Sequence, residues 1–324
     1  MIDEERPPPR LPMDEGREHL MVQVARLAWQ QDRTQTEIAA ETGLNRWQVS
    51  RLLQEARELG IVRIEIVPRL RRRPDVEAAL IGVFSLRDAM VVPATAGPDA
   101  VAQATGQYLA AIKPRPRLVG VSWGRTMAAV AHWLPPDWAD GVKVVQINGT
   151  VAPIPQAAGY NEVAETFARK GRGTFVPLPV PAVVGERITR EVLECDRIVA
   201  DVLRLARSAP VLCFSMGALS EDAALVLSGN VTPAEIAKLA RAGAVGDILG
   251  RYVDAQGDIV DEALDARTVG LSLPDLKARD RAIGVVSGPA KRRITLAALR
   301  AGLINVIVTD EETAAFALEH VHDR

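Results

Sequence analysis

Several residue types are scarce in this chain of 324 residues, and each scarcity excludes a class of protein. The two cysteines, Cys195 and Cys213, are too few for a disulfide framework or a thiolate metal site. Four histidines leave little material for a histidine-based active site, and we expect neither a metal nor a cofactor. No apolar run approaches the roughly 18 residues of a membrane span, and the N-terminus lacks an apolar signal-peptide core. We therefore expect a cytoplasmic protein without membrane contact.

The charge balance adds a further exclusion. The formal net charge is -2, so the chain is not a polycation that coats nucleic acid, and any DNA-binding surface must be local. Only 6 of the 39 basic residues are lysine, and the abundant arginine suits bidentate contacts to phosphate and guanine. The length predicts two domains, or one large domain with an appendage. We expect a disordered Pro-rich arm over 1–16, a helical domain ending in a short strand over 17–67, an Arg-rich linker over 68–74 and a larger domain over 75–324.

Two helices with recognisable starts lie near the N-terminus. Thr34-Gln-Thr-Glu37 is a capping box that opens a helix, and Gly43 supplies the left-handed residue that ends it. Asn45-Arg-Trp-Gln48 is a second box that opens another helix. Two helices joined by a short turn that contains glycine predict a helix-turn-helix.

The second of these helices has two different faces. Counting 100° per residue places one set on the inner side, namely Val49, Leu52, Leu53, Ala56 and Leu59. Trp47, Ser50, Arg51 and Gln54 lie on the other side, where such residue types suit base edges in the major groove. The helix starts offer backbone N–H groups to phosphate. We therefore expect DNA contacts from Thr34, Gln35, Asn45, Arg46, Trp47, Gln48, Ser50, Arg51 and Gln54.

Local charge agrees with this interpretation. Residues 44–73 hold eight arginines and three glutamates, a net of +5 in a chain of net charge -2. The alternative is a three-helix bundle used for packing or dimerisation, whose arginines are only solvated. An exposed Trp47 is hard to explain in that alternative, and we favour double-stranded DNA as the partner.

The larger domain alternates apolar strand-like runs with helical stretches. This alternation predicts βαβ units and an α/β fold with a mainly parallel sheet that is covered on both faces. The strand candidates are residues 89–92, 118–122, 142–147, 174–178, 211–215, 282–286 and 306–309. The helix candidates are residues 101–112, 126–133, 162–170, 190–207 and 292–301. A capping box headed by Thr309 predicts one more helix start.

Ligands of open α/β sheets bind beyond the carboxyl ends of the strands, and this rule singles out one loop above the others. Ser122, Trp123, Gly124, Arg125 and Thr126 connect a strand to a helix. Glycine allows close approach of the backbone, and the hydroxyls, the arginine and the helix N-terminus suit an anion. We predict a phosphate cradle, although the Walker ending is missing. The alternative is a tight turn in which serine and threonine act only as caps.

Three further positions are candidates for the same site. Gln146, Asn148 and Gly149 follow the next strand, where the amides would bond sugar hydroxyls, although an ordinary polar turn fits equally well. Asp247, in a glycine-rich stretch, would accept from hydroxyls or else cap its own turn. Lys291 stands at a helix start, where the dipole disfavours a cation unless an anion is bound. As a solvated lysine it would lose only about 0.3–1 kcal/mol there.

The runs 34–40 and 45–62 resemble the N-terminal domain of the SorC family of bacterial sugar-responsive transcriptional regulators. Residues 120–126, 246–252 and 306–314 are similar to stretches typical of that family, and the resemblance extends over about residues 17–320. It implies a C-terminal fold similar to phosphosugar isomerases and deaminases of the NagB/RpiA type, and a homodimer or homotetramer held by that domain. Some members bond an aldehyde sugar through a lysine, but the matching residue here is Asn148, which argues against Schiff-base chemistry. The resemblance also strengthens the case for Asp247.

These observations predict a sequence-specific DNA-binding regulator of sugar metabolism, and not an enzyme. A sugar or sugar phosphate would favour one quaternary state and thereby change operator affinity. The alternative is a phosphosugar isomerase or deaminase with a helical appendage. Asp247 would then serve as the base, yet no second acid or base stands at a convincing position.

Overall fold

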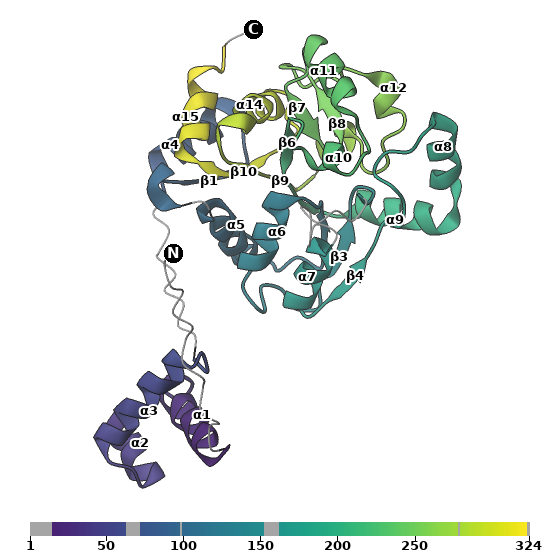
Figure 1. Cartoon of the computed structure of the whole chain (residues 1–324). Coiled ribbons are helices and arrows are strands. Elements are labelled where there is room, and N and C mark those ends of the chain that lie inside the picture. Colours follow the sequence, from purple (N-terminus) through teal and green to yellow (C-terminus); the bar gives the residue numbers. More distant parts are fainter. Residues whose placement is uncertain (1–14, 63–71, 98, 152–161, 278, 323–324) are drawn as a thin grey trace, which may run out of the picture. The chain divides into compact units, whose positions relative to one another are not determined.

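A computed structural model describes residues 15–62, 72–97, 99–151, 162–277 and 279–322 of the chain (Figure 1). The chain divides into two compact units, Met1–Arg69 and Leu70–Arg324, here the N-terminal unit and the C-terminal unit. Each unit buries a hydrophobic core of its own. Among the described residues, no helix combines the length and the apolar character needed to cross a membrane.

The N-terminal unit packs three helices, α1 (Glu15–Trp29), α2 (Gln35–Thr42) and α3 (Arg46–Glu58). Its core consists of Met21, Val24, Leu27, Ile38, Val49, Leu52 and Leu53. Both predicted capping boxes are confirmed, headed by Thr34 and Asn45, and Gly43 adopts the left-handed conformation at φ 72°. The predicted helix-turn-helix is therefore present.

Three details differ from the sequence interpretation. Leu59, placed on the inner face of α3, is 40% exposed because the helix ends at Glu58. Pro74, placed in the linker, is the first residue of α4 (Pro74–Phe84). Proline is favourable there because the N–H group that it lacks would have no partner within the helix. The expected arm over 1–16 ends too late, because Glu15 and Gly16 already belong to α1. The rest of that arm, the expected strand from residue 63 onward and the expected linker up to residue 71 lie outside the described residues.

The C-terminal unit is built on a parallel sheet of seven strands in the order β1-β10-β9-β5-β2-β3-β4. All seven predicted strands belong to it: β1 (Asp88–Val92), β2 (Leu118–Val121), β3 (Lys143–Gln146), β4 (Thr174–Val176), β5 (Val211–Phe214), β9 (Arg281–Val285) and β10 (Val306–Asp310). Its central strands are buried on both faces. In β5, for example, Val211 and Cys213 face one core cluster, whereas Leu212 and Phe214 face the other.

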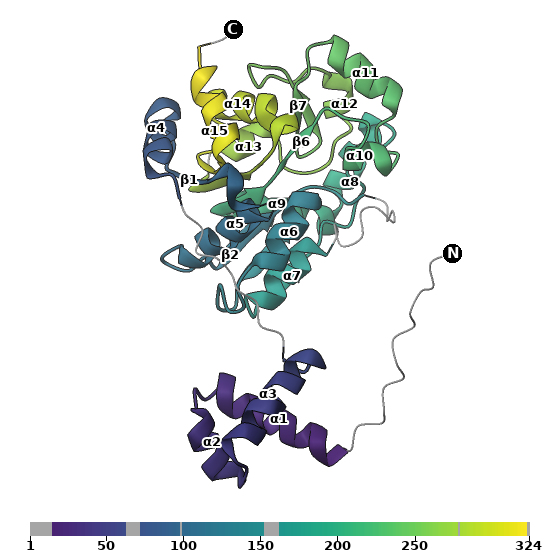
Figure 2. The same ribbon diagram turned by 60° about the vertical axis from the view of Figure 1, so that its left-hand side comes forward.

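Helices cover the two faces of this sheet (Figures 1 and 2). On one face lie α5 (Ala100–Ala111), α6 (Arg125–Trp133) and α7 (Val163–Lys170). On the other face lie α4, α9 (Arg197–Ser208), α14 (Arg292–Arg300) and α15 (Glu311–Glu319). Further helical elements of this unit are η1 (Ala94–Ala96), α10 (Ala224–Leu227), α11 (Pro233–Arg241), α12 (Glu262–Asp265), α13 (Leu273–Lys277) and η3 (Pro289–Lys291).

A second, antiparallel sheet was not predicted. It consists of β6 (Met216–Ala218), β7 (Gly246–Ile248) and β8 (Arg251–Val253). The strand β6 follows β5 after a single residue, Ser215, so the small sheet lies directly beyond the carboxyl ends of the large one. A Cβ atom at Gly217 would lie 1.9 Å from Asp247 Oδ1, and only glycine lets β6 pass this carboxylate.

Two predicted helices need correction. The expected helix over 190–207 is two helices, α8 (Arg187–Cys195) and α9. The break occurs at Asp196, which is extended and whose carboxylate accepts from the N–H groups of Ile198 and Val199, so that it caps α9. The last helix is capped by Asp310 and not by Thr309, since Asp310 Oδ1 accepts from the N–H of Thr313 at 2.7 Å.

Candidate functional site

A cavity of about 460 Å³ lies in the C-terminal unit beyond the carboxyl ends of β2, β3, β5 and β9. These four strands are neighbours in the middle of the sheet. From β2 the chain proceeds through β3 to β4 at one edge, whereas from β5 it proceeds through β9 to β10 in the opposite direction. The connections after β2 and β5 therefore separate, and such a switch point leaves a crevice for a ligand.

The loop after β2 supplies hydroxyl and backbone groups to this cavity. Gly124, at φ 121°, is the N-cap residue of α6, and no atom stands where its Cβ would be, so the backbone is open to a ligand. Thr126 lies in the first turn of α6, where N–H groups favour an anion. Lys291 Nζ donates to Thr126 Oγ1 at 3.0 Å and to Ser215 Oγ at 3.1 Å. Three segments that are distant in sequence therefore meet at one ammonium group.

Two groups of opposite charge line the cavity. Desolvation lowers the pKa of Lys291 to about 8; Asp247 opposes this change and Arg125 adds to it. Burial raises the pKa of Asp247, although the N–H of Gly250 donates to its carboxylate at 2.9 Å and Lys291 acts in the same lowering direction. A desolvated ammonium whose hydrogen bonds go to two neutral hydroxyls gains charge compensation from an anionic ligand.

Asn148 adds a buried amide with an unsatisfied acceptor. It is 3% exposed, it lines the cavity, and its Oδ1 has no hydrogen-bond partner among the described residues. Leaving such an acceptor unpaired costs about 1–3 kcal/mol, which a ligand hydroxyl would recover. Gln146 and Gly149 support the residues that line the cavity. Gln146 Nε2 donates to the Asn148 carbonyl at 2.9 Å, and the Gly149 carbonyl accepts from Trp123 Nε1 at 2.5 Å.

The structure brings most of the predicted effector residues together. Those that line the cavity are Ser122, Trp123, Gly124, Arg125, Thr126, Asn148, Asp247 and Lys291. Gln146 and Gly149 do not line it, and their contact with an effector stays a prediction. The loop over 288–291, singled out with Lys291 because it follows a predicted strand, lines the cavity as expected. The sequence interpretation missed the segments 215–218 and 222–225, which also line it. The first of these follows a predicted strand, so the strand-end rule pointed to it, but it carries no recognisable motif.

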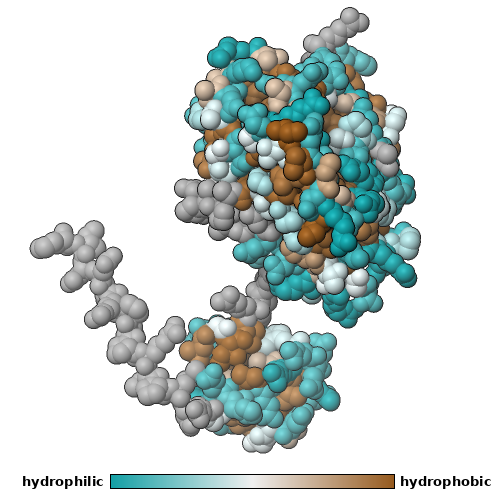
Figure 3. Space-filling model, turned by 90° about the vertical axis from the view of Figure 1, so that its right-hand side faces the viewer, coloured by the Kyte–Doolittle hydropathy of each residue, from teal (hydrophilic) through white to brown (hydrophobic). Residues whose placement is uncertain are grey.

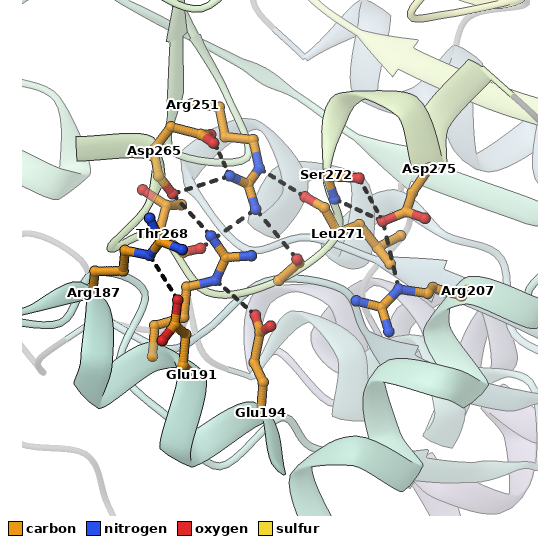
Figure 4. Close-up of polar contacts among 12 residues, drawn as sticks. Arg187, Glu191, Glu194, Arg207, Arg251, Asp265, Thr268, Leu271, Ser272 and Asp275 are labelled. Atoms are coloured by element: carbon orange, nitrogen blue, oxygen red, sulfur yellow. Dashed lines mark hydrogen bonds and ion pairs between the residues drawn. The ribbon is translucent and has the colours of Figure 1, made fainter. Parts of the chain in front are cut away.

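A buried arginine connects the small sheet to the loop over 265–271 (Figure 4). Arg251, on β8, is 2% exposed, and Nε donates to the Leu271 carbonyl at 3.0 Å. Its two terminal nitrogens donate to the carbonyls of Asp265, Thr268 and Gly270, and one of them also pairs with the Asp265 carboxylate. The loop over 265–271 therefore closes around one guanidinium group, and this arrangement holds the strand that follows Gly250 in place.

A second candidate surface lies on α3 in the N-terminal unit. Trp47 is 69% exposed, and the guanidinium carbon of Arg51 lies 5.7 Å from the centre of its ring. Arg51 Nε donates to Glu55 Oε1 at 3.0 Å, and Glu55 also accepts from Arg17. The contact with the Trp47 ring and the ion pair hold the arginine on the exposed face, and the ion pair with Glu55 uses Nε.

The other predicted DNA contacts divide into two groups. Thr34, Asn45 and Gln48 use their side chains in the capping boxes: Asn45 Oδ1 accepts from the Gln48 N–H at 2.9 Å, and Gln48 Oε1 accepts from the Asn45 N–H at 2.9 Å. Arg46, Ser50 and Gln54 are exposed with Trp47 and Arg51, whereas Gln35 is half-buried. Contact of any of these residues with DNA stays a prediction. Within the described ranges, no group of three or more His, Cys, Asp or Glu residues is arranged to hold a metal ion.

Comparison with known proteins gives consistent matches over nearly the whole chain. A family model for a sugar-binding domain matches residues 69–319. The chain is 31% identical over 307 residues to the deoxyribonucleoside regulator of Bacillus subtilis (strain 168), covering 93% of this chain and 98% of that one. It is 32% identical over 307 residues to the transcriptional regulator LsrR of Escherichia coli O157:H7, covering 91% and 94%. The full-length sorbitol operon regulator SorC from Klebsiella pneumoniae matches with a TM-score of 0.72 at 26% identity, covering 95% of this chain and 100% of that chain.

Proposed function

The chain belongs to the SorC family of sugar-binding transcriptional regulators, and from this premise we propose that it binds operator DNA through its N-terminal unit and a sugar or sugar phosphate through its C-terminal unit. The observation that carries the proposal is the cavity at the strand switch point. There a desolvated ammonium, a carboxylate and an unpaired amide oxygen meet a helix N-terminus. Such a set matches a ligand that has both an anionic end and hydroxyl groups.

Each end of the effector has its own set of partners in this proposal. The phosphate lies between the start of α6 and Lys291, whose ammonium also donates to Thr126. The hydroxyls lie toward Asp247, an acceptor, and Asn148, whose Oδ1 would accept a hydrogen bond. The residues present thus fit a sugar phosphate, whereas an unphosphorylated sugar would add no counter-charge to the ammonium beyond that of Asp247.

DNA recognition uses the exposed face of α3 in this proposal. Arg51 reads guanine by bidentate hydrogen bonds, and Trp47 contacts the neighbouring base edge or backbone. The N-termini of α2 and α3, both closed by capping boxes, offer backbone N–H groups to phosphates. Phosphate contacts fix the register, and Arg51 supplies the sequence preference.

Effector and operator are linked through quaternary structure in this proposal. A homodimer or homotetramer places two N-terminal units on the half-sites of a palindromic operator. An effector that binds one quaternary state more tightly changes operator affinity by the same coupling free energy, about 1–3 kcal/mol or 5–150-fold. The protein would act in the cytoplasm, where bacterial operators lie, and we propose no catalytic role for it.

One experiment tests DNA recognition. Purified protein selects duplexes from a random pool, and the enriched sequence is compared with a scrambled duplex by fluorescence anisotropy at several salt concentrations. The proposal expects a palindromic sequence that is bound at least 10³-fold more tightly. Equal affinity for both duplexes at every salt concentration contradicts it.

A second experiment tests the cavity. Pentose and hexose phosphates and their unphosphorylated counterparts are screened by thermal shift, since a ligand at about 100 times its Kd stabilises the protein by about 2.7 kcal/mol. Thr126→Val combined with Lys291→Ala should abolish the operator response to the phosphorylated compound while operator binding persists. Turnover of that compound would instead favour an enzyme, and an unchanged effector midpoint would rule out the cradle.

A further inference from the structure

Three side chains of α3 follow one another along the helix at a spacing of four residues. Glu55 Oε1 accepts a hydrogen bond from Arg51 Nε at 3.0 Å, and the guanidinium carbon of Arg51 lies 5.7 Å from the centre of the Trp47 ring. Residues four apart are neighbours on a helix, and long side chains lean toward its N-terminus. Arg51 is therefore held between a carboxylate and an aromatic ring.

A second arginine binds the same carboxylate from another helix. Arg17 Nη2, on α1, donates to Glu55 Oε1 at 3.1 Å and to Glu55 Oε2 at 2.8 Å. The Glu55 side chain is 23% exposed, whereas those of Arg17 and Arg51 are 49% and 59% exposed. The hydrogen bond from Arg17, and then that from Arg51, hold the pKa of Glu55 below its ordinary value although burial acts in the opposite direction. The carboxylate is therefore charged at neutral pH.

The ion pairs of Glu55 lie on a polar, solvated surface. Hydrophilic residues cover much of the N-terminal unit on the side that Figure 3 shows, and water screens the exposed arginines of these pairs. The pairs therefore contribute little to stability. Beside the face that we propose for DNA, a carboxylate also repels the phosphates of a duplex. Neither stability nor affinity for DNA accounts for Glu55.

The bond to Glu55 decides which edge of the Arg51 guanidinium is left to bind a base. A guanidinium donates two parallel hydrogen bonds either from Nε and one terminal nitrogen or from its two terminal nitrogens. Because Nε is bonded to Glu55, the two terminal nitrogens are the pair left for a bidentate contact. The O6 and N7 atoms of guanine accept such a pair in the major groove.

We infer that Glu55 is a positioning residue for Arg51, which it orients for end-on reading of one guanine and keeps from pairing with phosphates. The inference rests on the proposed DNA recognition by α3. Without the carboxylate, Arg51 would be free to turn toward any acceptor of the duplex, and its contribution would no longer depend on sequence. Glu55 thus lowers affinity for every duplex while it raises the preference for one.

The test compares Glu55→Ala with the parent protein by fluorescence anisotropy. The duplexes are the one that the whole protein selects, its variants at each base pair, and a scrambled duplex. At the base pair where Arg51→Ala loses discrimination, Glu55→Ala should lose at least about fivefold, the lower limit of what an arginine–guanine contact contributes. Affinity for the scrambled duplex should instead rise roughly twofold, because a repulsive charge has been removed. Unchanged discrimination at that base pair overturns the inference.

The charge-matched control is Glu58→Ala. Glu58, the last residue of α3, pairs with a different side chain, since it accepts from Gln54 Nε2 at 2.9 Å. This variant should bind the scrambled duplex more tightly, as Glu55→Ala does, but should keep the discrimination at the base pair of Arg51. Equal losses there in both variants would assign the effect to charge alone and contradict positioning.

Arg17→Met separates positioning from the packing of α1 on α3. It removes the ion pair between the two helices but keeps the bond between Glu55 and Arg51, so discrimination should stay within about twofold of the parent value. A loss as large as that of Glu55→Ala would show that the carboxylate acts by joining the helices, and the inference would be wrong. Melting curves establish that each variant is folded.

The double variant with Arg51→Ala and Glu55→Ala shows whether the carboxylate acts through the arginine. If it does, the second substitution adds no further loss at that base pair. Losses that multiply overturn the inference and leave Arg51 as a base reader. A parent protein that prefers no duplex contradicts the proposed DNA recognition itself, and the inference falls with it.

Discussion

The two units of this protein present the groups that we propose for recognition in opposite ways. In the N-terminal unit, Trp47 and Arg51 stand on the outside of a single helix, and the core beneath them is entirely apolar. In the C-terminal unit, Lys291, Asp247 and Asn148 come from three distant segments and lie in a cavity. A large polyanion is reached from a convex, solvated surface, whereas a small ligand must be enclosed by groups that have been removed from water.

This difference determines how much each surface affects the stability of its unit. An exposed arginine that pairs with a neighbouring glutamate changes stability by a few tenths of a kcal/mol, because water screens it. A buried amide oxygen or ammonium lacks that compensation and depends on its neighbours. Substitutions in the two units should therefore have different consequences, and four of them test this, beginning with the largest expected effect.

Arg251→Met tests how strongly the C-terminal unit depends on its buried charge. Removing the guanidinium leaves the Asp265 carboxylate and the carbonyls of the 265–271 loop without their donor. We expect the free energy of unfolding to fall by about 3–5 kcal/mol, measured by urea denaturation. The control is Arg207→Met, since Arg207 is 46% exposed and 3.6 Å from Asp275, and it should lose less than about 1 kcal/mol. Equal losses would contradict the contrast between buried and exposed charge.

Arg51→Ala tests the exposed surface, where recognition and stability should separate. We expect a loss of about 1–3 kcal/mol in discrimination at one operator base pair, with the melting temperature nearly unchanged. Binding is measured by anisotropy on operators substituted at each position. The control is Arg57→Ala. Arg57 is in the last turn of α3, and its guanidinium lies over the ring of Trp29 in α1, so its loss should change the affinity for all operator sequences alike. A uniform loss for Arg51→Ala would contradict base reading.

The pH dependence of effector binding tests the cavity electrostatics. The pKa of Lys291 is about 8 in the folded protein, below its ordinary value, because burial disfavours the charged form. An anionic ligand binds the charged form, so affinity should be constant below pH 8 and fall by up to about tenfold per pH unit above it. Isothermal calorimetry from pH 7 to 9 measures this. Lys291→Met should bind more weakly and without the slope, and a slope that survives in it would assign the titration elsewhere.

Thr34→Ala tests the local signals that build the N-terminal unit. The Thr34 hydroxyl caps α2 by accepting from the Glu37 N–H, and losing it should cost about 1 kcal/mol. Amide hydrogen exchange within α2 should then accelerate about fivefold. Thr36→Ala, an exposed change inside the same helix, keeps the cap and should not accelerate exchange. Similar rates for the two variants would show that the cap is not what holds the start of α2.

The contrast also explains what could be predicted from the sequence. Capping boxes and a glycine turn act between residues three or four apart, so the start of α2 at Thr34 and of α3 at Asn45 follow from local chemistry. The seven strands of the large sheet follow for a related reason, since strands buried on both faces are continuous apolar runs.

The rest depends on contacts that no local pattern carries. The strands β6, β7 and β8 have three residues each, and two of them contain glycine, which weakens a strand signal. Ser215 joins the cavity only because β5 ends beside the position of Lys291, 76 residues further along the chain. The break at Asp196 was hidden because the helical pattern continues on both sides of it. Long-range assembly, and not residue type, places these groups.

The cluster around Arg251 has a mechanical consequence. Asp265 accepts from Arg251 on β8 and from Arg190 on α8, so one aspartate is bound to both the small sheet and the outward-facing helix. Because a hydrogen bond tolerates only a few tenths of an ångström of stretch, a displacement of β8 that accompanied a change at Asp247 would carry α8 with it or break a bond. Through this one aspartate, the outer helix α8 is connected to the small sheet that carries Asp247.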